Sequence, residues 1–159
     1  MGDTTPPPGS TAPALHWHAY WWAGEELPDT ADRDDPGTAV PPRTPGEWFR
    51  KPHVLHRGNH VTAATALEWL AGRLFFEVPH PHAPYAVSGL IETAEGRLGA
   101  RQDVTWQYRS RRNRVVMAAM LTCPRPGYRC PQDPAPPPGP RPTGRTLLQA
   151  PAPAATGRL

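Results

Sequence analysis

The residues of this chain best suited to chemistry are its seven histidines, which fall into three groups. His16 and His18 are one residue apart, and on a strand that spacing puts both imidazoles on the same face. Two such imidazoles can bind one metal ion, and a third ligand from His53, His56 or His60 would leave a coordination position open for water. The metal hypothesis therefore assigns His16, His18, His56 and His60 as ligands. The competing interpretation treats them as ordinary histidines of a polar face or loop.

The second chemical signal is a basic turn over residues 109–114, Arg-Ser-Arg-Arg-Asn-Arg. Guanidinium groups on a rigid hairpin can hold phosphates or carboxylates through bidentate bonds and counterion release. Trp106 and Tyr108 would add stacking platforms if they face outward. The residues assigned to this predicted acidic-partner site are Arg97, Arg101, Trp106, Tyr108, Arg109, Arg111, Arg112 and Arg114.

Simpler interpretations of the same residues compete with this one. Hairpin tips are solvated and commonly charged. Arginine outnumbers lysine 16 to 1, which is typical of a GC-rich coding bias, so an arginine alone does not indicate phosphate recognition. Trp106 and Tyr108 alternate along an expected strand, and this pattern is also that of core residues.

Charge is unevenly distributed along the chain. Residues 1–47 carry a net charge of −6 and residues 48–159 a net charge of +9. Such asymmetry indicates either a polyanionic partner or internal neutralisation. The acidic loop predicted over 23–46 could lie against the arginine hairpin and neutralise it, or act as a displaceable mimic of the partner.

Other reactive groups are few. Cys123 and Cys130 have six residues between them; they lack the C-x-x-C spacing of many zinc sites, and in a reducing compartment we expect free thiols. The chain contains no nucleophile elbow, P-loop, dinucleotide fingerprint or H-E-x-x-H motif. No catalytic residue and no cofactor is therefore predicted, and an enzymatic function is not favoured.

Apolar periodicity predicts the elements that position these residues. We expect strands over 16–22, 85–92, 102–109 and 114–123, a short helix over 45–51, and an amphipathic helix over 63–78 capped by Thr62. The segment 114–123 is almost continuously apolar, so it is predicted to be a central strand buried on both faces. This order predicts an α+β fold, a small, largely antiparallel β-α-β-β-β sheet with one main helix packed on it.

The first of these strands has two chemically different faces. Trp17, Ala19 and Trp21 are the better core face, whereas the face of His16 and His18 has polar tips that need water or a partner. Trp21 and Trp22 point in opposite directions. They indicate either a protein-contact patch or a sheet covered on both faces.

The 24 prolines outline the domain organisation. Proline is dense over 1–14 and 124–159, which are predicted to be disordered arms, and sparse within a single domain over 15–123. The chain has no run of about 18 apolar residues that would span a membrane and no secretory signal, so we expect a cytoplasmic protein.

These observations favour a non-enzymatic interaction module whose arginine hairpin holds an acidic protein or a nucleic acid. The alternative is a small histidine-based metal-binding protein or metal-dependent enzyme.

Overall fold

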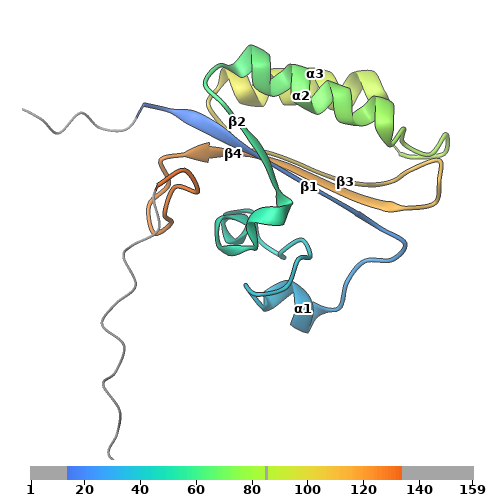
Figure 1. Ribbon diagram of the computed structural model, residues 1–159. Coiled ribbons are helices and arrows are strands. Elements are labelled where there is room, and N and C mark those ends of the chain that lie inside the picture. The colour runs from blue at the N-terminus through green and yellow to red at the C-terminus, as the bar shows by residue number, and fades with distance from the viewer. Residues whose placement is uncertain (1–13, 85, 134–159) are drawn as a thin grey trace, which may run out of the picture.

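The computed structural model describes residues 14–84 and 86–133, which form an α+β fold (Figure 1). A four-stranded antiparallel sheet has the order β2-β1-β4-β3. Its strands are β1 (His16–Gly24), β2 (His56–His60), β3 (Val104–Arg109) and β4 (Val115–Cys123). The helices are α1 (Thr30–Asp34), α2 (Ala63–Phe76) and α3 (Val87–Gly99), with short 3-10 helices η1 (Pro45–Arg50) and η2 (His53–Leu55). The predicted fold class is confirmed. The predicted arms at 1–13 and 134–159 lie outside the described residues.

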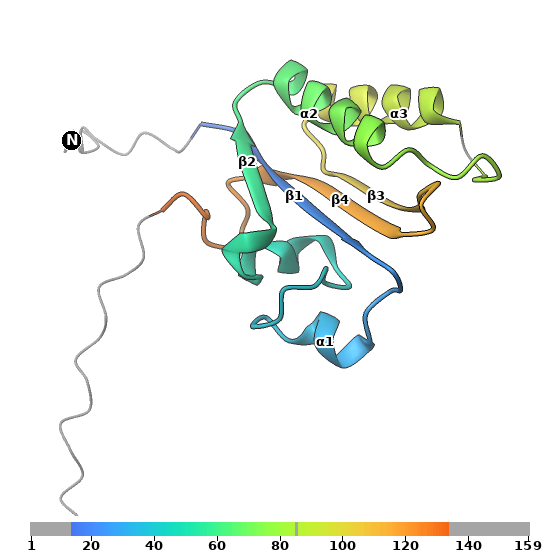
Figure 2. The same ribbon diagram turned by 45° about the vertical axis from the view of Figure 1, so that its right-hand side comes forward.

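Both faces of the sheet are covered. Helices α2 and α3 lie side by side over one face, and η1 and the segment around α1 lie on the other (Figures 1 and 2). Trp17 and Ala19 pack into the core beneath the two long helices, as predicted. Tyr20 packs with Trp48 and Leu55 on the opposite face, and His18 is fully buried there. The sheet is therefore covered on both faces, one of the two alternatives that the adjacent Trp21 and Trp22 left open.

Strand β4 is central, as its apolar sequence predicts. It pairs with β1 along its whole length and with β3 from Met120 to Val115. Val116 and Met120 face the two long helices, whereas Ala119 and Leu121 belong to the other core. The hairpin formed by β3 and β4 is also confirmed, with Arg109 opposite Val115 at its end.

The strand predicted over 85–92 is wrong, because this region begins helix α3. Its apolar residues Leu90, Ile91, Ala94 and Leu98 recur at steps of three and four, and all four contact the main core. A window ending at residue 92 does not contain enough of this period to distinguish a helix from a strand. The fold therefore has two main helices instead of one. Strand β2, which is short and polar, was not predicted.

Helix α2 begins as predicted and ends earlier. The Thr62 side chain caps it by accepting a hydrogen bond from the Thr65 amide at 3.2 Å. The helix ends at Phe76 instead of residue 78, and the Phe75 side chain near its end is 84% exposed. Among the described residues, no helix is both long and apolar enough to cross a membrane.

The acidic loop has internal structure. Lys51 donates hydrogen bonds to the backbone carbonyls of Asp32 and Asp35, the first at 3.1 Å. Arg33 donates to the carbonyls of Pro41 and Pro42 at 3.2 and 2.9 Å. The side chains of Lys51 and Arg33 thus hold the loop through its backbone carbonyls. The loop also contains helix α1.

The folded chain continues past residue 123, the point at which the dense prolines predict the start of a disordered arm. We call residues 124–133 the C-terminal strap. Arg125 forms an ion pair with Asp103, and the Tyr128 hydroxyl donates to a Glu47 carboxylate oxygen at 2.9 Å. A Cβ on Gly46 would come within 2.7 Å of the Tyr128 ring, so the ring needs glycine at that position. The strap is thereby held against η1 and the edge of the sheet.

Candidate metal centre

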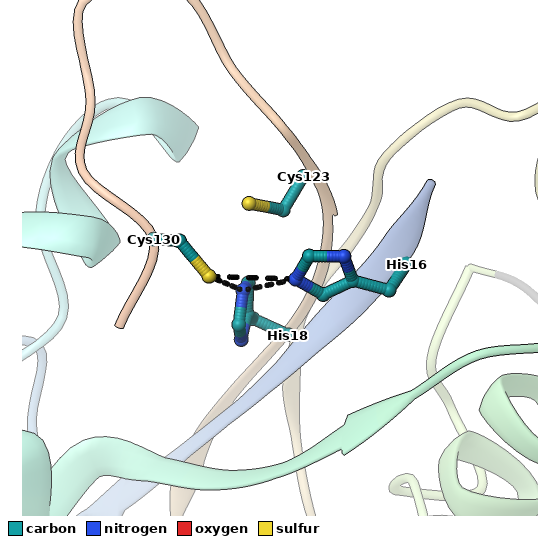
Figure 3. Close-up of side chains that lie close together, drawn as sticks. All are labelled: His16, His18, Cys123 and Cys130. Carbon is teal, nitrogen blue, oxygen red and sulfur yellow. Dashed lines mark hydrogen bonds between the residues drawn. The ribbon is translucent and has the colours of Figure 1, made fainter. Parts of the chain in front are cut away.

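Four side chains of metal-ligating type converge at one end of the sheet: His16, His18, Cys123 and Cys130 (Figure 3). One potential ligand atom from each lies within 4.8 Å of all the others. The Nε2 atoms of His16 and His18 are 3.1 Å apart, and the Cys130 Sγ lies 3.4 Å from each of them. The donor set is therefore two imidazole nitrogens and two sulfurs.

The strand register explains how three of these residues meet. His16 and His18 project from the same face of β1, and His16 lies directly opposite Cys123 on the neighbouring strand β4. Cys130 comes from the C-terminal strap, which folds back over the end of the sheet (Figure 3). Three donors thus come from the rigid sheet, and the fourth depends on the position of the strap.

The spacing of these atoms suits a tetrahedral ion. With Zn–N near 2.0–2.1 Å and Zn–S near 2.3 Å, a tetrahedron separates neighbouring ligand atoms by about 3.3–3.8 Å. The separation of 3.1 Å between the two nitrogens is slightly shorter than this range, and the two nitrogen–sulfur separations of 3.4 Å lie within it. All four ligand atoms lie within 4.8 Å of one another, so an ion of this size fits the cluster after small adjustments of the side chains.

Hydrogen bonds on the far side of each ring determine which nitrogen faces the cluster. His16 Nδ1 donates to the Ala14 carbonyl at 2.8 Å, and His18 Nδ1 donates to the Asn59 side-chain oxygen at 2.5 Å. Each Nε2 therefore presents a lone pair. Metal-bound histidines are usually held in this way by an outer acceptor.

A cation between the Nε2 atoms of His16 and His18 would stabilise their arrangement. If neither Nε2 carries a proton, the two atoms repel each other at their separation of 3.1 Å, and the single thiol proton of Cys130 can bond to only one of them at a time. A cation bound by both nitrogens removes this repulsion.

Burial keeps the donors in defined protonation states. Burial lowers the pKa of His18 to about 4, so its imidazole is neutral at neutral pH, the form that binds metals. Burial, assisted by the neighbouring Cys130 thiol, raises the pKa of Cys123 to about 12. Cys123 thus remains a thiol until a cation stabilises its thiolate.

The predicted metal ligands are only partly brought together. His16 and His18 meet as the same-face argument predicts. The His56 Nε2 instead lies 3.2 Å from the outer nitrogen of His18 and 3.0 Å from the Asn59 oxygen, on the side away from the thiols. His60 lies farther along β2, where its ring is 6.2 Å from the Trp69 ring.

Sequence reasoning missed the two sulfur donors. Cys123 and Cys130 lack a standard zinc spacing, and the relation of Cys123 to His16 exists only in the register of β1 with β4. The usable signal was the length of the segment between the cysteines. Six residues with two prolines and a glycine are enough for the chain to turn back on itself.

The arginines assigned to an acidic-partner site lie at two places. Arg109, Arg111, Arg112 and Arg114 are at the turn between β3 and β4, whereas Arg97 and Arg101 precede β3 and lie at its other end. The buried carboxylate of Glu77 accepts a hydrogen bond from Arg114 at 2.7 Å and lies 3.8 Å from Arg112.

The beginning of the acidic loop lies beside the hairpin, and the Arg109 guanidinium donates to the Glu25 carbonyl at 3.5 Å. Glu25 and Glu26 line a cleft together with Arg109, Arg112 and Arg114. The ion pairs found at the hairpin within the described residues are made with Glu77 of the loop after α2 instead of with the acidic loop.

The proposed aromatic platforms face inward. Trp106 is 6% exposed and Tyr108 is 4% exposed, and both belong to the core beneath α2 and α3. The Tyr108 hydroxyl donates to the Glu77 carbonyl at 2.8 Å. The outward orientation on which base stacking depended is therefore wrong, because the even-numbered face of β3 is the one that packs against the helices.

The cluster could support two kinds of chemistry. Cys130, His18 and Asn59 have the order of a thiol, an imidazole and an amide, as in thiol hydrolases. That arrangement has no role for the second thiol of Cys123 or for the lone pair of His16. Metal binding uses all four donors and both outer acceptors, and it is the better explanation.

Comparisons of this chain with protein-family models, with curated proteins and with solved structures found no match.

Proposed function

We propose that this protein is a small metal-binding module in which His16, His18, Cys123 and Cys130 hold one zinc ion. The observation that carries the proposal is the convergence of two imidazole Nε2 atoms, 3.1 Å apart, with two thiol sulfurs within 4.8 Å. Two nitrogens and two sulfurs form a donor set typical of zinc.

The role of the ion in this proposal is structural. Four protein ligands complete a tetrahedron and leave no position for substrate or water, as in closed zinc sites. Three of the ligands belong to β1 and β4, and the fourth belongs to the C-terminal strap. The ion would therefore fasten the strap to the sheet.

Metal analysis of the untagged full-length chain tests the proposal. We expect one zinc per chain after purification, retained through gel filtration and removed by a strong chelator. Replacing zinc with cobalt should give the visible spectrum of a tetrahedral site with sulfur ligands. Cys130→Ser and His18→Gln should each lose the bound metal.

His82→Ala is the matched control, because His82 is exposed and lies outside the cluster. Zinc content that is the same in all of these variants would contradict the assignment.

A second candidate function is contact between the β3–β4 turn and an acidic partner. The observation favouring it is that Arg112 is 72% exposed and Arg111 is also exposed beside it. Binding of mixed-sequence DNA, RNA or an acidic peptide should weaken with salt and with Arg111→Ala/Arg112→Ala. Unchanged salt dependence in that variant would count against this surface.

A further inference from the structure

The two cysteines of the metal centre are also close enough to react with each other. They are the only cysteines in the chain, and both are free thiols. Their sulfur atoms lie within 4.8 Å of each other. The residues between them form a turn of the C-terminal strap, so Cys130 can approach Cys123 by movement of the strap alone.

The two thiols differ in access to solvent. Cys123 is buried at the end of β4, with 3% of its surface exposed, whereas Cys130 is half-buried on the strap. A small oxidant can therefore reach the Cys130 sulfur first, and the Cys123 sulfur lies behind it. This is the arrangement of an attacking thiol and a resolving thiol.

We propose that Cys123 and Cys130 are a redox modification site at which a peroxide forms a disulfide and expels the metal ion. This inference rests on the proposed zinc centre. It adds a regulated release of the ion to what would otherwise be a permanent structural site.

The chemistry balances with a peroxide as the oxidant. The Cys130 thiolate attacks one peroxide oxygen, the O–O bond breaks, and hydroxide leaves as Cys130 becomes a sulfenic acid. The Cys123 thiolate then attacks the Cys130 sulfur, and a second hydroxide leaves as the S–S bond forms. The two hydroxides take up two protons to give two waters. The two sulfurs lose two electrons in total, and the peroxide gains them.

Disulfide formation removes half of the donor set. The two imidazoles of His16 and His18 remain, and a pair of neutral nitrogens on one strand holds zinc far less tightly than two nitrogens with two thiolates. The ion leaves, and the disulfide takes over its role of joining the strap to β4. A thiol reductant reverses the step and restores the binding site.

The experiment treats the zinc-loaded full-length chain with hydrogen peroxide. Zinc release is followed with a chromogenic chelator, and the loss of two hydrogens per chain is followed by intact mass. We expect the two signals to rise together, and dithiothreitol with added zinc to reverse both. Zinc that stays bound after the disulfide has formed, or zinc that leaves without a disulfide, would overturn the inference.

Two variants separate this inference from general oxidative damage. Cys130→His keeps four potential ligands but cannot form the disulfide. Peroxide should therefore release zinc from this variant at least roughly tenfold more slowly than from the native chain. Cys123→Ser should stop at the Cys130 sulfenic acid, which dimedone traps as a mass adduct. Dimedone labelling of Cys123 in the Cys130→Ser variant at an equal rate would overturn the assigned order of attack.

The failure of the proposed function gives a different result. A chain that takes up no zinc in its reduced form would overturn the metal centre and the release together. Zinc that binds to the reduced chain and remains bound in peroxide overturns the redox step alone.

Discussion

The Nε2 atoms of His16 and His18 lie 3.1 Å apart, and both rings use their Nδ1 atoms to donate to oxygen acceptors on the far side. The two imidazoles are therefore held with their lone pairs directed at the same point. This arrangement is costly without a cation and favourable with one.

Asn59 should control metal affinity without binding the metal. Its side-chain oxygen accepts from His18 and from His56, so it orients the His18 lone pair. Asn59→Ala should weaken zinc binding by roughly 10- to 100-fold, as is usual for such outer acceptors. Chelator competition would measure this loss. Asn59→Asp keeps the acceptor and adds a charge, so it should bind zinc at least as tightly as the native chain; equal loss in both variants would contradict the role.

Zinc should protect the C-terminal strap from proteolysis. Arg129 is exposed and precedes Cys130, so trypsin can cleave there once the strap is released. Addition of a chelator should accelerate this cleavage, as followed by mass spectrometry. Cleavage at the exposed Arg111 and Arg112 provides an internal control, because the hairpin is far along the sheet from the cluster. Equal acceleration at both places would indicate general unfolding instead of strap release.

The metal-free protein should lose stability in mild acid. Burial lowers the pKa of His18 from 6.5 to about 4, and burial also lowers the pKa values of His56 and His60. The unfolded chain binds a proton at His18 more readily than the folded chain does. The contribution of His18 to the free energy of unfolding is therefore smallest below pH 4. The stability it contributes is complete above pH 6.5 and is lost progressively between pH 6.5 and 4.

The size of this effect can be measured by denaturant unfolding across that pH window. A shift of this size on a fully buried imidazole corresponds to about 3 kcal/mol. Facing groups modulate the shift: Asn59 and Asp133 favour protonation of His18, whereas His16 and His56 oppose it. His18→Gln should flatten the profile. An unchanged slope in that variant would assign the effect to the other histidines.

Zinc affinity should rise with pH. The pKa of Cys123 is raised to about 12, so binding must displace its proton at any physiological pH. This residue alone contributes about one decade of affinity per pH unit. Proton release measured by calorimetry in buffers of different ionisation enthalpy checks this directly, and binding without proton release would contradict thiolate coordination.

Arg114 should be a structural residue of the hairpin. It donates to the buried carboxylate of Glu77 at 2.7 Å and to the Ala23 carbonyl at 2.8 Å. Arg114→Ala should cost about 1–3 kcal/mol of unfolding free energy, because a buried carboxylate loses its closest partner, with some solvent screening at the half-exposed guanidinium. Arg111→Ala, at an exposed position of the same turn, should change stability little. Equal effects would argue that Glu77 does not depend on Arg114.

Local periodicity was enough to predict much of the fold. Three elements can be predicted from short stretches of sequence. They are β3 from its apolar alternation, β4 from its continuous apolar run, and α2 from its periodicity and its Thr62 cap. The segment 85–92 alone is compatible with a strand, because the core contacts that define helix α3 extend to Leu98, outside that segment. Strand β2 was missed because His-Arg-Gly-Asn-His has no apolar face, and only pairing with β1 makes it a strand.

Only the two histidines of the candidate site could be predicted from local sequence, because the two cysteines join them through long-range contacts. The two histidines are neighbours on one strand, so the period of a strand is enough to bring them together. Their partners come from the other end of the chain, and contact between His16 and Cys123 follows from a strand register that no local pattern contains. Outer acceptors such as Asn59 depend on the same long-range pairing.

The most direct test of the central claim is X-ray absorption at the zinc edge on the purified, untagged full-length chain. The account predicts two nitrogen neighbours at about 2.0–2.1 Å and two sulfur neighbours at about 2.3 Å. It further predicts that Cys130→Ser loses the ion. A shell of oxygen and nitrogen neighbours without sulfur, or a chain free of metal after reconstitution under reducing conditions, would contradict the metal centre.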